Sequence, residues 1–172
     1  MEDIIIFMTE KKYVWAFTNQ RKLTKGEFID YFEKKVFKTI RKHNMLPKDK
    51  IFRFANFNNL NAKILRSIIQ KKFIVEESKT PNMGEDNLST VAEEIFSKIL
   101  NGDFTGSNPK EEEISYPLYF HSDAEIETYA NQIGLKGKKM QRNKKIQDLF
   151  NKFKDKNPDL EINVVKALAQ IQ

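Results

Sequence analysis

Apolar positions in the first third of the chain form two short runs and then a helical pattern. The runs, residues 4–8 and 13–17, are separated by a polar stretch and predict a small β-hairpin. A capping box, Thr24-x-x-Glu27, follows and opens an amphipathic helix that we expect to reach about residue 44. The predicted buried face of this helix has residues at helical spacing: Phe28, Ile29, Phe32, Val36, Phe37 and Ile40.

The next segments have the order strand, helix, strand, helix. Residues 51–55 predict a buried strand, residues 60–70 a helix, residues 73–75 a second strand, and residues 89–100 a helix closed by Asn101-Gly102. A helix that connects two neighbouring strands places them parallel. We therefore expect a small α/β layer with one parallel strand pair.

The last third of the sequence predicts helices. Residues 105–113 are rich in Gly, Ser, Pro and Glu, which indicates an exposed connector. A second capping box, Ser122-x-x-Glu125, opens a helix to about residue 133, and residues 143–154 form another amphipathic pattern. Asn157-Pro158 supplies an N-cap and a proline at the first helical position for a final helix, residues 160–171. Among single residues, Phe150 and Phe153 are expected in the core, His121 packed or in a loop, and His43 as an exposed cation at a helix end.

The amino-acid composition excludes several kinds of catalytic and metal site. The chain has 172 residues, 40% of them hydrophobic, and 14 Phe, which is typical of a folded domain. It has no Cys and two His, so disulfides, Cys nucleophiles, thiolate zinc sites and Cys-held iron–sulfur clusters are excluded. No apolar run is long enough to span a membrane. We expect a cytoplasmic protein with no membrane partner, no metal and no cofactor.

The net charge of +6 is concentrated in one region. Residues 134–156 contain nine basic and two acidic residues, a net +7, so the rest of the chain is nearly neutral. Residues 136–145, here termed the basic segment, contain six bases and no acid, and Gly134 and Gly137 mark a flexible connection that enters a helix. Such a cluster is either a solvated helix face or a contact for nucleic-acid phosphates that weakens with salt. The candidate RNA-binding residues are Lys136, Lys138, Lys139, Arg142, Lys144 and Lys145.

Several motifs follow one another at a recognisable spacing. They are Leu23-Thr-Lys-Gly-Glu-Phe-Ile, Asp49-Lys-Ile-Phe-Arg-Phe-Ala, Asn87-Leu88, Ile99-Leu-Asn-Gly-Asp, Tyr116-Pro-Leu, Glu125-Ile-Glu-x-Tyr-Ala and Asn157-Pro158. This order resembles the PP-loop ATPases that 2-thiolate tRNA. The resemblance implies a reduced adenine-nucleotide-hydrolase-like α/β layer with an N-terminal β-hairpin and a helical C-terminal tail, and tRNA or other RNA as partner. It divides the chain into a hairpin and long helix that is a zinc-knuckle remnant (1–46), a reduced PP-loop-like core (47–104) and a helical region with the basic stretch (105–172).

The same resemblance implies that the family's functional positions are replaced. The Cys and His of its zinc knuckle fall on Thr24 and Glu27, which are not a structural zinc pair. Its PP-loop, Ser-Gly-Gly-x-Asp-Ser, falls on residues 56–61, where Phe57 and Asn58 replace the glycines that let backbone amides approach a pyrophosphate. In another alignment, residues 59–66 match the helix upstream of the family's Gly-His-Asn-Leu, and the PP-loop is deleted. The vestigial nucleotide site would comprise Asn56, Phe57, Asn58, Asn59 and Asn87.

The acidic Asp-Asp-Glu that would handle magnesium in the family reads Ser89-Thr90-Val91 here. We therefore predict a pseudoenzyme without catalytic residues, a reduced relative of the thiolation enzymes. It would bind tRNA or other RNA, or dock on a full-length thiolation enzyme. Two alternatives stay open: a homo- or heterodimeric protein–protein module without RNA binding, and a residual ATP-dependent tRNA sulfurtransferase.

Overall fold

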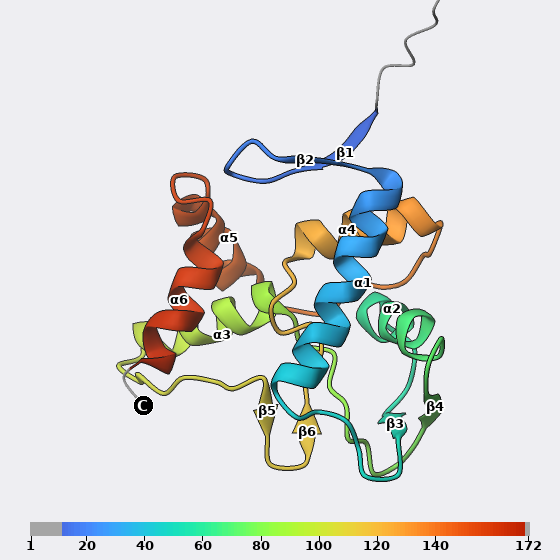
Figure 1. The fold of residues 1–172 in the computed structure, drawn as a ribbon. Helices are drawn as coiled ribbons and strands as arrows, with labels where there is room; N and C mark the ends of the chain where they lie inside the picture. The colour runs from blue at the N-terminus through green and yellow to red at the C-terminus, as the bar shows by residue number, and fades with distance from the viewer. Residues whose placement is uncertain (1–11, 171–172) are drawn as a thin grey trace, which may run out of the picture.

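The computed structural model describes residues 12–170 and begins with an antiparallel hairpin of β1 (Tyr13–Ala16) and β2 (Lys22–Thr24) (Figure 1). The strand predicted at residues 13–17 is confirmed, but its partner in the described residues is downstream, with Trp15 opposite Leu23. Leu23 is buried and supplies the apolar side chain that the sequence pattern did not single out. The predicted partner strand, residues 4–8, lies outside the described residues.

The capping box at Thr24 begins α1 (Lys25–Lys42), as predicted. The Thr24 N–H donates to Oε2 of Glu27 at 2.8 Å, which is the half of the box that the glutamate side chain supplies. The buried face of α1 consists of Phe28, Phe32, Val36, Thr39 and Ile40. The helix ends at His43, whose ring packs against Phe120. Partial burial lowers the pKa of His43, so the expected exposed cation is wrong.

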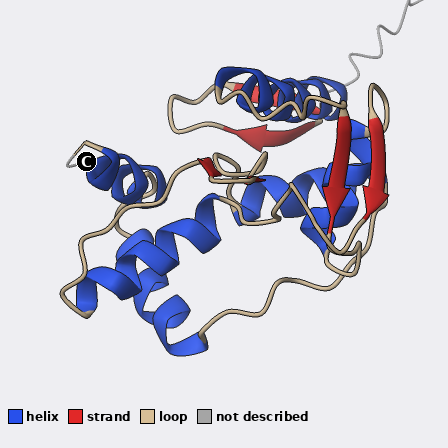
Figure 2. Ribbon diagram, turned by 90° about the horizontal axis from the view of Figure 1, so that it is seen from below, coloured by secondary structure: helices blue, strands red, loops and turns tan. Residues whose placement is uncertain are grey.

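The predicted parallel pair is confirmed by β3 (Ile51–Phe54) and β4 (Ile74–Glu77), with α2 (Leu60–Ile69) as the connection. Figure 2 shows these two strands side by side and pointing the same way. The second strand begins one residue later than predicted, and Phe73 just before it packs its ring against Phe52 at a centroid distance of 5.3 Å. The described residues form three two-stranded sheets, and β3–β4 is the parallel one.

The C-terminal half contains α3 (Leu88–Leu100), α4 (Asp123–Ile133), α5 (Lys144–Lys154) and α6 (Leu160–Ala169). The helix predictions are confirmed, with one wrong cap: α6 follows Asp159, and Asn157 instead accepts the Leu160 N–H through its carbonyl in a turn. The connector predicted at residues 105–113 is partly ordered, because β5 (Lys110–Glu111) pairs with β6 (Ile114–Ser115). Among the described helices none is long and apolar enough to cross a membrane.

Two apolar clusters hold these elements together. The larger one joins α1, β3, α2 and α4, with Phe32 stacked on Tyr129 at a centroid distance of 4.3 Å. The smaller one joins α3, α5 and α6 around Phe150, which is fully buried as predicted. Phe153 is 48% exposed, so its predicted core position is wrong; its ring lies at the rim against Phe96. Most of the basic segment, residues 136–143, lies in the connection between α4 and α5, and its last two residues begin α5.

Candidate nucleic-acid interface

The first part of the basic segment, residues 136–142, is fixed to the N-terminal end of α2. The carbonyl of Lys138 accepts the Leu60 N–H at 2.8 Å, and Nζ of Lys63 donates to the carbonyl of Lys136 at 3.1 Å. Gly137 lies so close that a Cβ there would be 2.8 Å from Cα of Leu60. Gly134 ends α4 at a φ of 70°, which glycine adopts without strain. The connection that the sequence predicted to be flexible is therefore closely packed against α2 at Gly137.

The predicted vestigial nucleotide residues serve as helix caps and turns. Asn59 caps α2 by accepting the Ala62 N–H at 2.8 Å, and Asn87 caps α3 by accepting the Thr90 N–H at 3.0 Å. Oδ1 of Asn56 accepts the Asn58 N–H in a tight turn. Phe57 packs on Phe54, and the guanidinium of Arg66 lies 4.7 Å from its ring. A phosphate at this end of α2 would compete with Asn59 and with the Lys138 carbonyl for the same amide donors.

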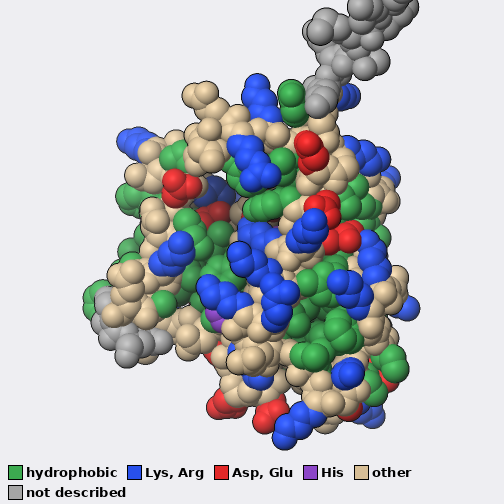
Figure 3. Space-filling view, viewed as in Figure 1, with side chains coloured by type: hydrophobic (Ala, Val, Ile, Leu, Met, Phe, Trp, Pro, Cys, Tyr) green, Lys and Arg blue, Asp and Glu red, His purple; other side chains and the backbone are tan. Residues whose placement is uncertain are grey.

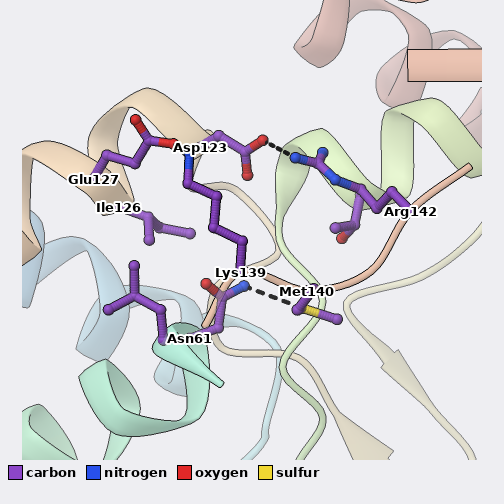
Figure 4. A pocket seen from close by; sticks show the side chains of 9 residues that line it. Asn61, Asp123, Ile126, Glu127, Lys139, Met140 and Arg142 are labelled. Carbon is purple, nitrogen blue, oxygen red and sulfur yellow. Dashed lines mark hydrogen bonds and ion pairs between the residues drawn. The ribbon is translucent and has the colours of Figure 1, made fainter. Parts of the chain in front are cut away.

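A small cavity lies where α2, α3, α4 and the basic segment meet (Figure 4). Its open volume is about 20 Å³, which is room for one water molecule. In Figure 4 the side chain of Lys139 extends along this cavity toward Glu127, with which it forms an ion pair. Small-molecule sites occupy about 300–1,000 Å³, so a nucleotide does not fit in this conformation. The cavity-lining residues are Leu60, Asn61, Thr90, Asp123, Ile126, Glu127, Lys139, Met140 and Arg142.

Arg142 bridges two helices. Its Nη1 donates to Oε1 of Glu93 in α3 at 2.9 Å, and its Nη2 donates to Oδ2 of Asp123 in α4. The side chains of Arg142 and Glu93 are 15% and 9% exposed. Burial raises the pKa of Glu93, and the nearby Arg142 charge opposes that rise. Arg142 and Lys139 therefore have carboxylate partners within the chain, which the sequence pattern did not indicate.

The positions that replace the family's acidic residues also have local partners. The Ser89 hydroxyl donates to Oε1 of Glu161 at 2.6 Å and accepts the Asp123 N–H at 3.0 Å. Nζ of Lys154 lies 3.1 Å from the same Glu161 oxygen. Together with Arg142, these contacts form a polar network that ties α3, α4, α5 and α6 together. Its carboxylates are each paired with a base, which leaves their charge compensated inside the protein.

Four of the six candidate bases are exposed and have no carboxylate partner among the described residues: Lys136, Lys138, Lys144 and Lys145. Lys144 and Lys145 occupy the first turn of α5, and this turn contains no acid. Positive charge at a helix N-terminus opposes the helix dipole and lowers helix stability. The placement of these two lysines is therefore not explained by the stability of α5.

A second basic surface was not predicted from the sequence. Residues 34–42 contain five bases and no acid: Lys34, Lys35, Lys38, Arg41 and Lys42. Figure 3 shows Lys and Arg side chains gathered over α1 on the face turned to the viewer. The net charge of the chain outside residues 134–156 did not reveal this surface, because acidic residues elsewhere cancel the charge of these five bases. Counting bases along the outward face of the predicted helix would have found it.

The sequence matches no protein-family model and no curated protein. The fold is more informative, because it is shared with an enzyme that thiolates tRNA. The solved structure is the U34-tRNA thiolase NcsA from Methanococcus maripaludis with its 4Fe–4S cluster, similar to this chain with a TM-score of 0.63 and 13% sequence identity. The alignment covers 89% of this chain and 81% of that chain. The mixed α/β fold is confirmed in this coarse form, and at 13% identity the likeness concerns the fold alone. That the chain is a reduced, degenerate relative of the family that its sequence motifs resemble stays a prediction.

Proposed function

We propose that this protein is a non-catalytic relative of the tRNA-thiolating enzymes that binds RNA, and tRNA in particular, through the exposed lysines of the basic segment. The observation that carries the proposal is the placement of Lys144 and Lys145. They lie in the first turn of α5, where they destabilise the helix and have no carboxylate partner among the described residues. A phosphate backbone is the partner that would compensate this charge.

The geometry divides the six candidate residues into two groups. Lys136, Lys138, Lys144 and Lys145 would contact phosphates, since their side chains are exposed. Arg142 is held between Glu93 and Asp123 and would position the basic segment on the protein instead of contacting RNA. Lys139 is exposed but paired with Glu127, so it would reach RNA only by exchanging that partner. The two groups predict different mutational effects.

The contacts at the N-terminal end of α2 favour a non-catalytic role. The amide donors that a nucleotide's phosphates would use are taken by Asn59 and by the Lys138 carbonyl. The cavity beside them holds about 20 Å³. Calorimetric titration with ATP and magnesium tests this part: an absence of heat is expected, and saturable binding would contradict it.

The RNA-binding part is tested by fluorescence anisotropy with labelled tRNA between about 50 and 300 mM salt. In the test variant, Lys136, Lys138, Lys144 and Lys145 are all changed to Ala. In the matched control, four other exposed lysines are changed to Ala: Lys12, Lys48, Lys79 and Lys166. The test variant should bind tRNA at least about tenfold more weakly, with a salt slope smaller by about three units, because each lost phosphate contact lowers the slope by about 0.7–0.9.

Wild-type protein that binds no tRNA at the lowest salt, or a test variant that matches the control, would overturn the proposal. Arg142→Ala is a further discriminating variant. If Arg142 positions the segment, its effect on tRNA binding should be accompanied by lower protein stability. The lysine variant should keep its stability or gain slightly, because Lys144 and Lys145 oppose the helix dipole of α5.

A second candidate function, a protein–protein module, is favoured by apolar side chains on the C-terminal helices. Leu149 and Phe153 of α5 are 37% and 48% exposed. Leu100 at the end of α3 and Phe104 beyond it are 54% and 61% exposed. Light scattering over a range of protein concentrations tests self-association. A dimer that dissociates on Phe153→Ser, with unchanged tRNA binding, would favour this role, and a monomer at all concentrations would count against a homodimer.

A further inference from the structure

An open groove lies between the β1–β2 hairpin and α1, away from the basic segment. It encloses about 570 Å³ and is lined by Arg21 from the hairpin and by α1 residues. The α1 residues that line it are Glu27, Asp30, Tyr31, Lys34, Lys35 and Lys38. Four of the seven lining residues are basic. Figure 1 shows the hairpin extending from the start of α1, so the two walls of the groove come from adjacent segments of chain.

The junction of the two walls alternates cations and aromatic rings. The Arg21 guanidinium lies 5.6 Å from the centroid of the Phe17 ring. Phe17 meets Tyr31 edge to face at 5.2 Å, and Nζ of Lys35 lies 5.6 Å from the Tyr31 ring. These contacts form a continuous row from the hairpin to the helix. Interleaved cations and rings are the composition of surfaces that track a single-stranded nucleic acid.

The acids of the groove already have partners. Asp30 pairs with Lys34 at 2.8 Å, and Glu27 accepts from the backbone and hydroxyl of Thr24 in the capping box. Arg21 and Lys38 are exposed, and neither has a carboxylate partner among the described residues. Lys34 and Lys38 stand one helical turn apart, about 6 Å along the axis, on the same side of α1. Lys35 pairs with Glu125 of α4 at 2.7 Å, so the positive charge of the groove that no carboxylate of the described residues compensates lies at Arg21 and Lys38.

We propose that this groove binds unpaired nucleotides of the protein's RNA partner, with Arg21, Lys34 and Lys38 at phosphates and the Phe17–Tyr31 ring pair beside the bases. This inference rests on the proposed function, since it assumes that the partner is RNA. Unpaired nucleotides fit better than a duplex because stacked, paired bases hide the faces that aromatic rings and guanidinium groups contact. The basic segment and the groove would then recognise phosphates and exposed bases, respectively.

A labelled oligouridine of about 12 nucleotides, within the range that single-strand surfaces cover, is the probe, with labelled tRNA beside it. The test variant is Arg21→Ala, Lys34→Ala and Lys38→Ala together. The matched control removes the same number of charges elsewhere, at Lys48, Lys79 and Lys166. All six side chains are exposed, so both variants should fold, which circular dichroism checks. The aromatic row is tested separately by Phe17→Leu, which keeps an apolar side chain and removes the ring.

The groove variant should bind oligouridine at least about tenfold more weakly than the control, and Phe17→Leu about fivefold or more, since one base–ring contact contributes about that much or more. A groove variant that equals the control on both probes, while the basic-segment variant loses tRNA, would overturn this inference and leave the proposed function standing. Wild-type protein that binds neither probe would overturn both. Binding of polyglutamate but not oligouridine, lost in the groove variant, would overturn the inference and assign the groove to an acidic polypeptide.

Discussion

The carbonyl of Lys138 accepts the amide N–H of Leu60 at 2.8 Å, although the two residues belong to different halves of the chain. This bond caps the first amide of α2 with the chain's own backbone. In nucleotide-binding α/β folds, the N-terminal end of a helix that follows a strand is where phosphate binds. Here the basic segment covers that end, so its lysines face solvent while its backbone closes the helix.

Gly137→Ala should weaken the attachment of the basic segment. A Cβ at this position would lie 2.8 Å from Cα and 3.0 Å from the backbone N of Leu60, and backbone atoms of a helix leave little room to adjust. Overpacking of this kind costs about 1–3 kcal/mol. Urea unfolding of the variant should therefore give a free energy of unfolding lower by about that amount.

The control is Gly26→Ala in the first turn of α1, where a Cβ would meet nothing within 4 Å. That change should leave stability unchanged or raise it by up to about 1 kcal/mol, since Ala restricts the unfolded chain. Equal effects of the two substitutions would contradict the close packing of Gly137 against Leu60.

Arg142→Ala should destabilise the protein in a pH-dependent way. It leaves the Glu93 carboxylate nearly buried and without its base, at an expected cost of about 2–3 kcal/mol at pH 7. Burial already raises the pKa of Glu93, and loss of Arg142 should raise this pKa further. An acid whose pKa is higher in the folded state destabilises folding as pH rises through that pKa. The difference in unfolding free energy between wild type and variant should thus shrink from pH 7 toward pH 4.5, which urea unfolding at both values measures.

A second substitution distinguishes this explanation from lost packing. Glu93→Gln in the Arg142→Ala background removes the uncompensated charge and should recover part of the stability at pH 7. A loss that does not change with pH and is not recovered by Glu93→Gln would mean that Arg142 acts through the packing of its aliphatic part.

Local sequence patterns predicted the helices and the parallel strand pair well, because capping boxes and amphipathic spacing involve residues that are close together in the sequence. The Thr24 and Ser122 boxes both cap helices at the predicted residues. The site was less predictable, since partners such as Arg142 and Glu93 lie 49 residues apart in sequence. Counting charges in the sequence identified Lys144 and Lys145 as candidate RNA contacts. It could not distinguish them from Arg142, whose side chain is held by Glu93 and Asp123 in the folded protein. It also overlooked the bases of α1, whose charge acids elsewhere cancel.

Asn87 should be required for the stability of the fold. Its side chain is fully buried, accepts the Thr90 N–H and donates through Nδ2 to Oδ1 of Asp123 at 2.8 Å. Asn87→Ala loses both contacts and leaves Asp123 short of a donor, so we expect a loss of about 2–3 kcal/mol. Asn87→Ser keeps a cap acceptor and should lose about half as much. Thermal and urea unfolding of the two variants would reveal this order, and a neutral Asn87→Ala would contradict it.

His121 should make the protein sensitive to acid. Its ring is fully buried against Phe32, with Lys35 and Glu125 as the charged groups nearby, and burial lowers its pKa from 6.5 to about 3. Between these values the unfolded chain binds a proton on this ring and the folded protein does not, so stability falls as pH decreases through this range. The contribution to the free energy of unfolding is up to about 1.4 kcal/mol per pH unit.

In urea unfolding from pH 7 to 4, the free energy of unfolding of His121→Gln should therefore decline less steeply than that of the wild type. The pKa of His43 is also lowered by burial, but this histidine is only partly buried, so His43→Gln should change the slope less. Parallel curves for wild type and His121→Gln would contradict a neutral, buried His121.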